Sequence, residues 1–188
     1  MRPCVTLTFD NGPTPQVTAG VHDCLTRHDV KSTFFPIGTK AAKPSGAALL
    51  HRVHDEGHWI GNHTFTHGTP LGELDAASAV REVQRAEEVL SWVVQPQHLF
   101  RPFGGAGRIG RHLLHPAAVE MLVVGKYTCV FWNCVPGDWR DPEGWLDRAI
   151  AHCLWHAWSL VVLHDTATGA MVYLDRFLQH LTAKAGTL

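Results

Sequence analysis

Short apolar runs alternate along the chain with longer stretches in which apolar residues recur every three or four positions. The short runs are rich in β-branched and aromatic residues, which indicates buried strands, and the periodic stretches indicate helices with one buried face. The pattern predicts strands at residues 5–9, 32–35, 58–60, 95–100, 127–132 and 160–163. It predicts helices over about 15–28, 74–94, 142–155 and 170–183, and one over about 108–123 that is broken or bent near Pro116. One more helix begins at Pro44, with Ala48, Leu49 and Val53 facing inward.

The order of these elements indicates an α/β fold. Strands and helices alternate, and the strands are nearly continuous apolar runs, as expected for a parallel sheet covered by helices. If the sheet closes on itself, the fold is a β/α barrel. The chain has 188 residues and shows no internal repeat, low-complexity stretch or linker, so we expect a single domain over residues 1–188.

Residues with reactive or metal-binding side chains directly follow several predicted strands. A barrel would bring them together, because the loops after its strands form one face, and that face carries the active site. These residues are Asp10, Asn11, His63, His67, Arg101, Asp138 and His164.

The segment after the third predicted strand is the main candidate for a metal site. His63 and His67 are separated by three residues, and both imidazoles can reach one divalent metal if the backbone turns between them. The spacing alone is a weak signal, because the chain contains 14 histidines and His54 and His58 repeat it. Asn11 could supply a third ligand through its side-chain oxygen, which leaves positions open for water and substrate.

The remaining candidates suit hydrolysis by a metal-activated water. Asp10 could take a proton from the water, and Arg101 beside it would keep the carboxylate ionised. His164 could protonate the leaving group, with Asp138 fixing its orientation and favouring its charged form.

Each of these residues also has a purely structural alternative. A tight turn explains Asp10, a surface ion pair explains Arg101, and a hydrogen-bonded core position explains His164. Trp139 is equally consistent with a core position and with a platform for a sugar ring. The agreement of all positions with one face of a barrel favours the functional interpretation.

Composition and charge exclude several classes of function. The 16 basic and 17 acidic residues give no net positive electrostatic field that would attract a polyanion, so we expect no nucleic-acid partner. No apolar run is long enough to span a membrane. The five cysteines show no C-x-x-C pair, which favours structural thiols. Only Met1 to Cys4 precede the first predicted strand, which leaves no room for a signal peptide, so we expect a cytoplasmic location, or secretion if the sequence is trimmed.

Five segments of the chain resemble the five motifs of the NodB-homology polysaccharide deacetylases, carbohydrate esterase family 4. In the family's order, they are T-F-D-N-G-P at residues 8–13, H-T-F-T-H at 63–67, R-P-F-G at 101–104, D-W at 138–139 and L-H-D at 163–165. The resemblance implies a distorted (β/α) barrel, with seven strands expected here. It also implies release of acetate from N-acetylated sugars or chitin-like oligosaccharides.

The resemblance implies roles for individual residues. Asp10 would be the base oriented by Arg101, and His164 would be the general acid. One divalent metal, zinc first and cobalt or nickel as alternatives, would be held by Asn11, His63 and His67. The substrate would be contacted by Phe103, Gly104, Trp139 and Leu163.

The chain departs from the family's motifs at three positions, which bear on the expected metal binding and substrate contacts. Asn11 replaces a metal-binding aspartate, Val135 replaces the first aspartate of the fourth motif, and Gly104 stands near the place of an aromatic residue. A neutral ligand at position 11 predicts weaker metal retention, although the bound ion would acidify water more strongly. Two alternatives stay open: hydrolysis of small non-peptide C–N bonds in amides or ureides, and a non-catalytic binding domain that has lost its metal.

Overall fold

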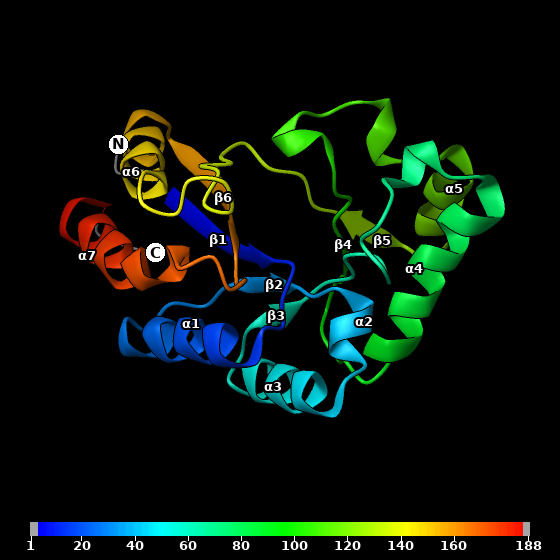
Figure 1. The fold of residues 1–188 in the computed structure, drawn as a ribbon, viewed down its shortest axis with the longest axis horizontal. Helices are drawn as coiled ribbons and strands as arrows, with labels where there is room; N and C mark the ends of the chain where they lie inside the picture. Colours follow the sequence, from blue (N-terminus) through cyan, green and yellow to red (C-terminus); the bar gives the residue numbers. More distant parts are fainter. Residues whose placement is uncertain (1–3, 186–188) are drawn as a thin grey trace.

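All strand pairs in the computed structural model are parallel (Figure 1). The structure describes residues 4–185, so the first and last three residues of the expected domain lie outside it. Its strands are β1 (Cys4–Asp10), β2 (Thr33–Phe35), β3 (Trp59–Ile60), β4 (His98–Phe100), β5 (Tyr127–Cys129) and β6 (Trp158–His164). Its α-helices are α1 (Pro15–Arg27), α2 (Gly38–Ala41), α3 (Pro44–Asp55), α4 (Ala76–Leu90), α5 (Pro116–Val124), α6 (Trp145–Trp155) and α7 (Leu174–Ala185).

The strands form a distorted, incomplete barrel. One sheet has the order β3-β2-β1-β6, and β4 pairs with β5 in a second sheet. A single bridge between Asn62 and Phe100 joins the two sheets, and Cys134 bridges to Val161 on the outer side of β6. The described residues thus contain six strands where seven were expected. Between β5 and β6 the chain forms only the isolated bridge at Cys134, and not a further strand.

The helix predicted over residues 108–123 is much shorter in the structure and begins at Pro116. Gly104, Gly105 and Gly107 have positive φ angles, which glycine adopts without steric cost, so the chain turns repeatedly in this region. Short 3-10 turns occupy Gly105–Gly107 and Arg111–Leu113. The short helix α2 was not predicted, and α3 buries Leu50 where Ala48 and Leu49 were expected to face inward.

The register between β1 and β6 decides which side chains face the barrel interior. Asp10 lies opposite His164, and Phe9 lies opposite Leu163. Because alternate residues of a strand point to opposite faces, Asp10 and His164 share the interior face. Phe9 and Leu163 point the other way and pack in the main hydrophobic core.

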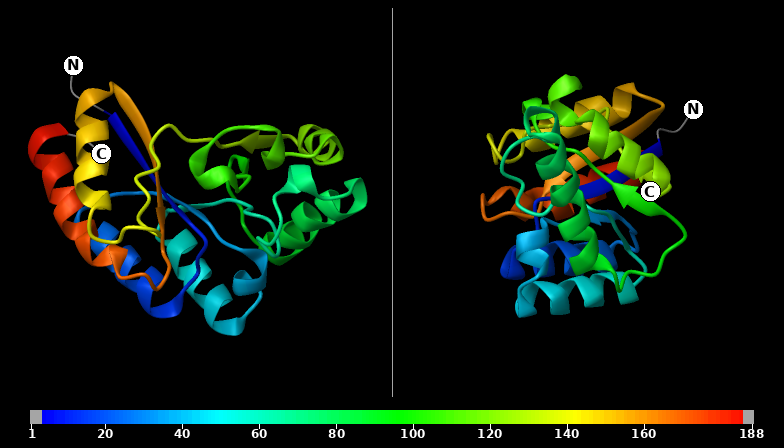
Figure 2. Two further views of the ribbon diagram at one scale, coloured as in Figure 1. Left: turned by 45° about the horizontal axis from the view of Figure 1, so that its top comes forward. Right: turned by 90° about the vertical axis from the view of Figure 1, so that its right-hand side faces the viewer.

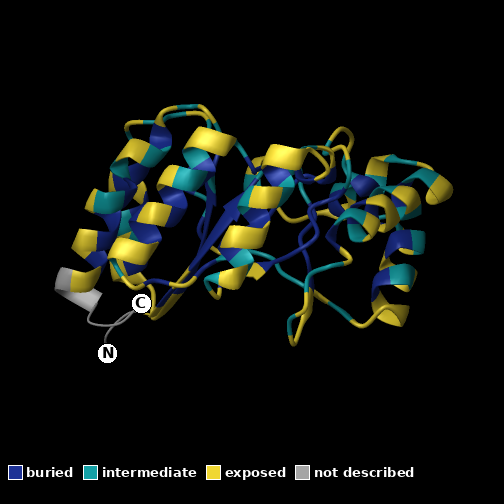
Figure 3. Ribbon diagram, turned by 90° about the horizontal axis from the view of Figure 1, so that it is seen from below, coloured by how far each residue is buried: buried dark blue, intermediate teal, exposed yellow. Residues whose placement is uncertain are grey.

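The main core lies between the larger sheet and the helices α1, α6 and α7, which cover its outer side (Figure 2). A second cluster packs α4 and α5 against β4 around Phe100. Each helix keeps its exposed residues on the side away from the strands (Figure 3). Within the described range, no helix has both the length and the apolar character that crossing a membrane requires.

His58, the residue before β3, should make the fold sensitive to acid. Its side chain is buried, and its Nδ1 accepts a hydrogen bond from the backbone N–H of Ser32 at 3.1 Å. Burial, helped by the nearby His22, lowers the pKa of His58 to about 4. Because the unfolded histidine titrates near 6.5, the free energy of unfolding should fall between pH 6.5 and 4, by up to about 1.4 kcal/mol per pH unit.

Urea unfolding at pH 7, 6 and 5 measures this slope. His58→Asn keeps an acceptor for the Ser32 N–H but cannot be protonated in this range, so it should flatten the slope. If the free energy of unfolding depends on pH in the same way in the variant, the acid sensitivity comes from other groups.

Candidate active site

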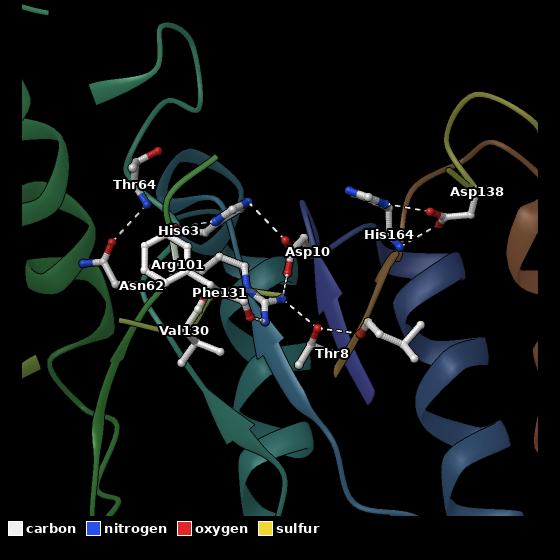
Figure 4. A network of polar contacts seen from close by, with 11 residues as sticks. Thr8, Asp10, Asn62, His63, Thr64, Arg101, Val130, Phe131, Asp138 and His164 are labelled. Carbon is white, nitrogen blue, oxygen red and sulfur yellow. Dashed lines mark hydrogen bonds and ion pairs between the residues drawn. The ribbon is translucent and has the colours of Figure 1, made fainter. Parts of the chain in front are cut away.

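Asp10 is a buried carboxylate at the carboxyl end of β1. Its Oδ1 accepts a hydrogen bond from Nη1 of Arg101 at 2.8 Å (Figure 4). Burial would raise the pKa of Asp10, but the charge of Arg101, with smaller contributions from His63 and His164, lowers it below its ordinary value. The carboxylate is therefore ionised at neutral pH and can accept a proton.

Arg101 follows β4 and is completely buried. Besides Asp10, it donates hydrogen bonds to Thr8 Oγ1 at 2.6 Å and to the carbonyl oxygen of Val130 at 3.2 Å. Its guanidinium carbon lies 4.1 Å from the centre of the Phe35 ring. Because no part of the side chain is exposed, the alternative of a surface ion pair does not apply, and Arg101 holds Asp10 in a fixed position.

The two histidines after β3 lie side by side. Their ring centres are 4.9 Å apart, and Nδ1 of His63 donates to the carbonyl oxygen of Arg101 at 2.8 Å. That bond leaves the lone pair on Nε2 of His63, which lies 3.7 Å from Oδ2 of Asp10. Burial lowers the pKa of both rings, that of His67 to about 3. Both are therefore neutral at pH 7 and available as metal ligands.

The turn that carries these histidines is held by Asn62. Its amide nitrogen donates to the carbonyl oxygen of Val83 in α4, and its amide oxygen accepts from the backbone N–H of Thr64. Thr64 and His67 both have positive φ angles, so the backbone turns between the histidines as a shared metal would require. Phe103 stacks on the His67 ring at 3.8 Å and fixes its orientation.

Asn11 offers an oxygen ligand in the same place. It has a φ of 72°, a conformation that asparagine tolerates better than most residues. Lys40 binds its carbonyl oxygen at 2.7 Å, and its side-chain Oδ1 is buried without a hydrogen-bond partner. An unpartnered buried oxygen costs free energy. Two neutral imidazoles and this oxygen line one cavity, so the residues present fit a divalent cation.

His164 ends β6 and lies beside Asp10 on the interior face of the larger sheet, because β1 and β6 are neighbouring strands. Asp138, fully buried, accepts from Nδ1 of His164 at 2.9 Å and from its backbone N–H at 2.8 Å. Burial would lower the pKa of His164, but the hydrogen bond and charge of Asp138 outweigh it and raise the pKa. Trp139 meets the His164 ring edge to face at 4.8 Å. The other ring nitrogen of His164 is free to serve as a proton donor.

A cavity of about 330 Å³ connects these groups. Of the residues predicted from sequence, it is lined by Asp10, Asn11, His63, His67, Phe103, Gly104, Trp139 and His164. Arg101 and Asp138 lie behind Asp10 and His164. The volume falls within the range of small-ligand pockets.

Leu163 does not lie where the sequence analysis placed it. It is fully buried in the main core, and its neighbour Val162 lines the cavity instead. The alternation of side chains along β6, counted back from His164, would have identified Val162. Trp132, Val135 and Gly107 also line the cavity and were not predicted as contact residues. Trp132 was expected at the end of a strand over 127–132, but β5 ends at Cys129 and leaves Trp132 in the following loop.

Comparison with known proteins adds independent information. The family model described as "Polysaccharide deacetylase" matches residues 1–114. The chain is 32% identical over 166 residues to a chitooligosaccharide deacetylase of Bradyrhizobium sp. (strain ANU 289), a match that covers 86% of this chain and 70% of that protein. It is 31% identical over 165 residues to a peptidoglycan-N-acetylglucosamine deacetylase of Bacillus cereus, with coverage of 86% and 72%.

Solved structures of similar fold have TM-scores of 0.75 to 0.79 in several comparisons. One is a pseudoenzyme of carbohydrate esterase family 4 from Bacillus anthracis. Its TM-score is 0.78 at 20% identity, over 97% of this chain and 61% of that one. At this identity the likeness concerns the fold alone, and it supports the distorted barrel.

Proposed function

The chain belongs to the polysaccharide deacetylase family, carbohydrate esterase family 4, and we propose on this premise that it removes acetyl groups from N-acetylated amino sugars, with chitin-like oligosaccharides as the favoured substrates. The observation that carries the proposal is the register of β1 and β6, in which Asp10 lies opposite His164. An arginine-held carboxylate and a carboxylate-held imidazole thus lie side by side at one cavity, as acid–base catalysis of amide hydrolysis needs.

In this proposal, Asn11, His63 and His67 hold one divalent metal, with zinc favoured by the nitrogen and oxygen donors. A cation bound there would supply Lewis-acid charge, which acidifies water and polarises an acetyl carbonyl. Since Asn11 is neutral, retention of the cation should be weaker than with an aspartate at this position.

The protein's own groups would move the protons. Asp10 accepts a proton from the attacking water, and Arg101 keeps the carboxylate ionised and oriented. As the C–N bond breaks, His164 donates a proton to the departing amine, and acetate and the free amino sugar are the products. Asp138 favours the charged form of His164 and fixes the orientation of its ring.

The loop after Arg101 suits the developing negative charge on the acetyl oxygen. Gly104 has a φ of 123°, which glycine alone adopts readily, and a Cβ there would lie 2.9 Å from Pro70. Phe103 and Gly104 both line the cavity, and we expect a backbone N–H of one of them to stabilise this charge. Trp139, on the opposite wall, could stack on a sugar ring.

A substrate panel tests the proposal. Acetate release from chitooligosaccharides, with zinc, cobalt or nickel added, would support it. Product formation from simple amides or cyclic ureides, without acetate release from sugars, would favour the related hydrolase of small C–N bonds. The further alternative, a non-catalytic binding domain, rests on Asn11 at the position of a metal-binding aspartate. A site that never takes up metal and releases no product would support that alternative.

Asp138→Asn should shift the alkaline limb of the pH–rate profile to lower pH. The general acid must be protonated, so activity is present below the raised pKa of His164 and is lost as pH rises through it. Removing the charge of Asp138 lowers that pKa, and we expect a loss of about tenfold or more in kcat at pH 8. Asp141→Asn, which removes an exposed carboxylate paired with Arg148, is the matched control. An unshifted limb in Asp138→Asn would contradict the role of His164.

A further inference from the structure

Three metal-binding side chains that play no part in the proposed reaction lie together between α1 and α7. Cys24 lies in the last turn of α1, His28 caps that helix, and Asp175 is the second residue of α7. The Nε2 of His28 is 2.9 Å from Oδ1 of Asp175, and Sγ of Cys24 is 3.9 Å from the same oxygen. One donor atom from each residue lies within 4.8 Å of the other two. None of the three lines the active-site cavity.

The helix geometry explains why these side chains converge. Residues four positions apart lie on the same face of a helix, so Cys24 and His28 project in the same direction. The first turn of α7 packs against that face and brings in Asp175. A thiol, an imidazole and a carboxylate are the three ligand types that zinc uses in proteins.

The cluster also has a place for a further ligand. A second cavity, of about 390 Å³, touches both Cys24 and Asp175. Its other walls are mostly apolar and include Val17, Val21 and Met171. Three protein ligands beside an open cavity leave one coordination position for water or a small molecule, whereas a purely structural zinc site is closed by four protein ligands.

We propose that Cys24, His28 and Asp175 form a second site for a divalent transition metal of the zinc class. Binding replaces the S–H bond of Cys24 by a sulfur–metal bond, and the proton passes to solvent. The thiolate and the carboxylate together neutralise the two charges of the cation.

Binding of the cation would replace interactions that Asp175 already makes, among them a hydrogen bond from the Gln179 side chain at 2.6 Å. The hydrogen bond between His28 and Asp175 would be lost, and both groups would turn their lone pairs to the cation. Arg27 pairs with Asp175 at 3.4 Å, but its side chain is 60% exposed and can move into solvent. The bound metal would link α1 to α7 and so stabilise the folded state, since a ligand that binds the native protein preferentially shifts the unfolding equilibrium.

Cobalt(II) titration of the full chain distinguishes this site from the active site. A cobalt ion bound to thiolate gives a sulfur-to-metal charge-transfer band in the near ultraviolet, and the ligands Asn11, His63 and His67 contain no sulfur. We expect one thiolate-bound cobalt per chain, displaced by zinc. Cys24→Ser should abolish the band, and Cys4→Ser, which alters an exposed thiol, should leave it unchanged.

Variants of the other two ligands test the site independently, in case Cys24→Ser fails to fold. His28→Gln and Asp175→Asn change partly exposed side chains, and each should weaken cobalt binding at least about tenfold, because even the loss of a ligand's hydrogen-bond partner has an effect of that size. Absence of the band in the wild-type protein, or its persistence in Cys24→Ser, would overturn the proposal. Acetate release by Cys24→Ser should match the wild type, so failure of this site and failure of the deacetylase proposal are separate results.

Discussion

Asp10→Asn is expected to reduce acetate release by about a hundredfold or more, the usual effect of removing a catalytic base. An amide cannot accept the proton from water, although it can still accept the hydrogen bond from Arg101. The loss should appear in kcat, measured on a chitooligosaccharide with the metal present in excess.

The same variant must be shown to fold. Arg101 loses its charged partner in a buried position, which lowers stability, but it keeps its hydrogen bonds to Thr8 and Val130. We therefore expect unchanged secondary structure by circular dichroism and a lower unfolding temperature. Asp23→Asn, which removes an exposed carboxylate from Arg52, is the control. Full activity of Asp10→Asn would refute its assignment as the base.

His63→Ala is expected to remove most of the metal from the active site. The Nε2 lone pair of His63 has a fixed direction, because the hydrogen bond from Nδ1 to the carbonyl of Arg101 holds the ring. Loss of one of three ligands should lower affinity at least about tenfold. Metal content after zinc reconstitution and dialysis measures the effect, in a Cys24→Ser background so that the second proposed site does not contribute.

The control for this variant is a histidine of identical spacing. His54 and His58 repeat the pattern of His63 and His67, but His54 contacts the carbonyl of Val94 and the Trp92 ring. His54→Ala should therefore leave the metal content unchanged. If His63→Ala retains the full complement of zinc, the ligand assignment is wrong.

The order of strands and helices could be predicted from sequence because each element has a clear period. The boundaries of β1 and α1 agree with the prediction to within one residue. The errors fall where local sequence is ambiguous. The helix expected from residue 108 begins only at Pro116, because Gly110, Leu114 and His115 have extended backbone that apolar periodicity does not reveal. The inward face of α3 was misjudged because Ala48, Leu49 and Leu50 are all apolar.

Many residues of the candidate site could be predicted from the sequence for the same reason, since they follow strands and the fold brings the strand ends together. The hydrogen bonds that orient these residues could not be predicted. Nothing in the sequence indicates that the carbonyl of Arg101 sets the tautomer of His63, or that Asp138 binds His164 twice. The cluster at Cys24 was equally hidden, because His28 and Asp175 are 147 residues apart in the chain.

The single bridge between Asn62 and Phe100 affects how precisely the catalytic residues are positioned relative to one another. His63 follows β3, so it stands on the larger sheet with Asp10 and His164, whereas Arg101 follows Phe100 on the sheet of β4 and β5. The hydrogen bonds that join the Arg101 side chain to Asp10 and the Arg101 carbonyl to His63 therefore cross the joint between the two sheets. A poorly fitting side chain around Phe100 would displace Arg101 against both partners, so remote packing defects should first appear as slower turnover and loosened metal affinity, before any loss of thermal stability.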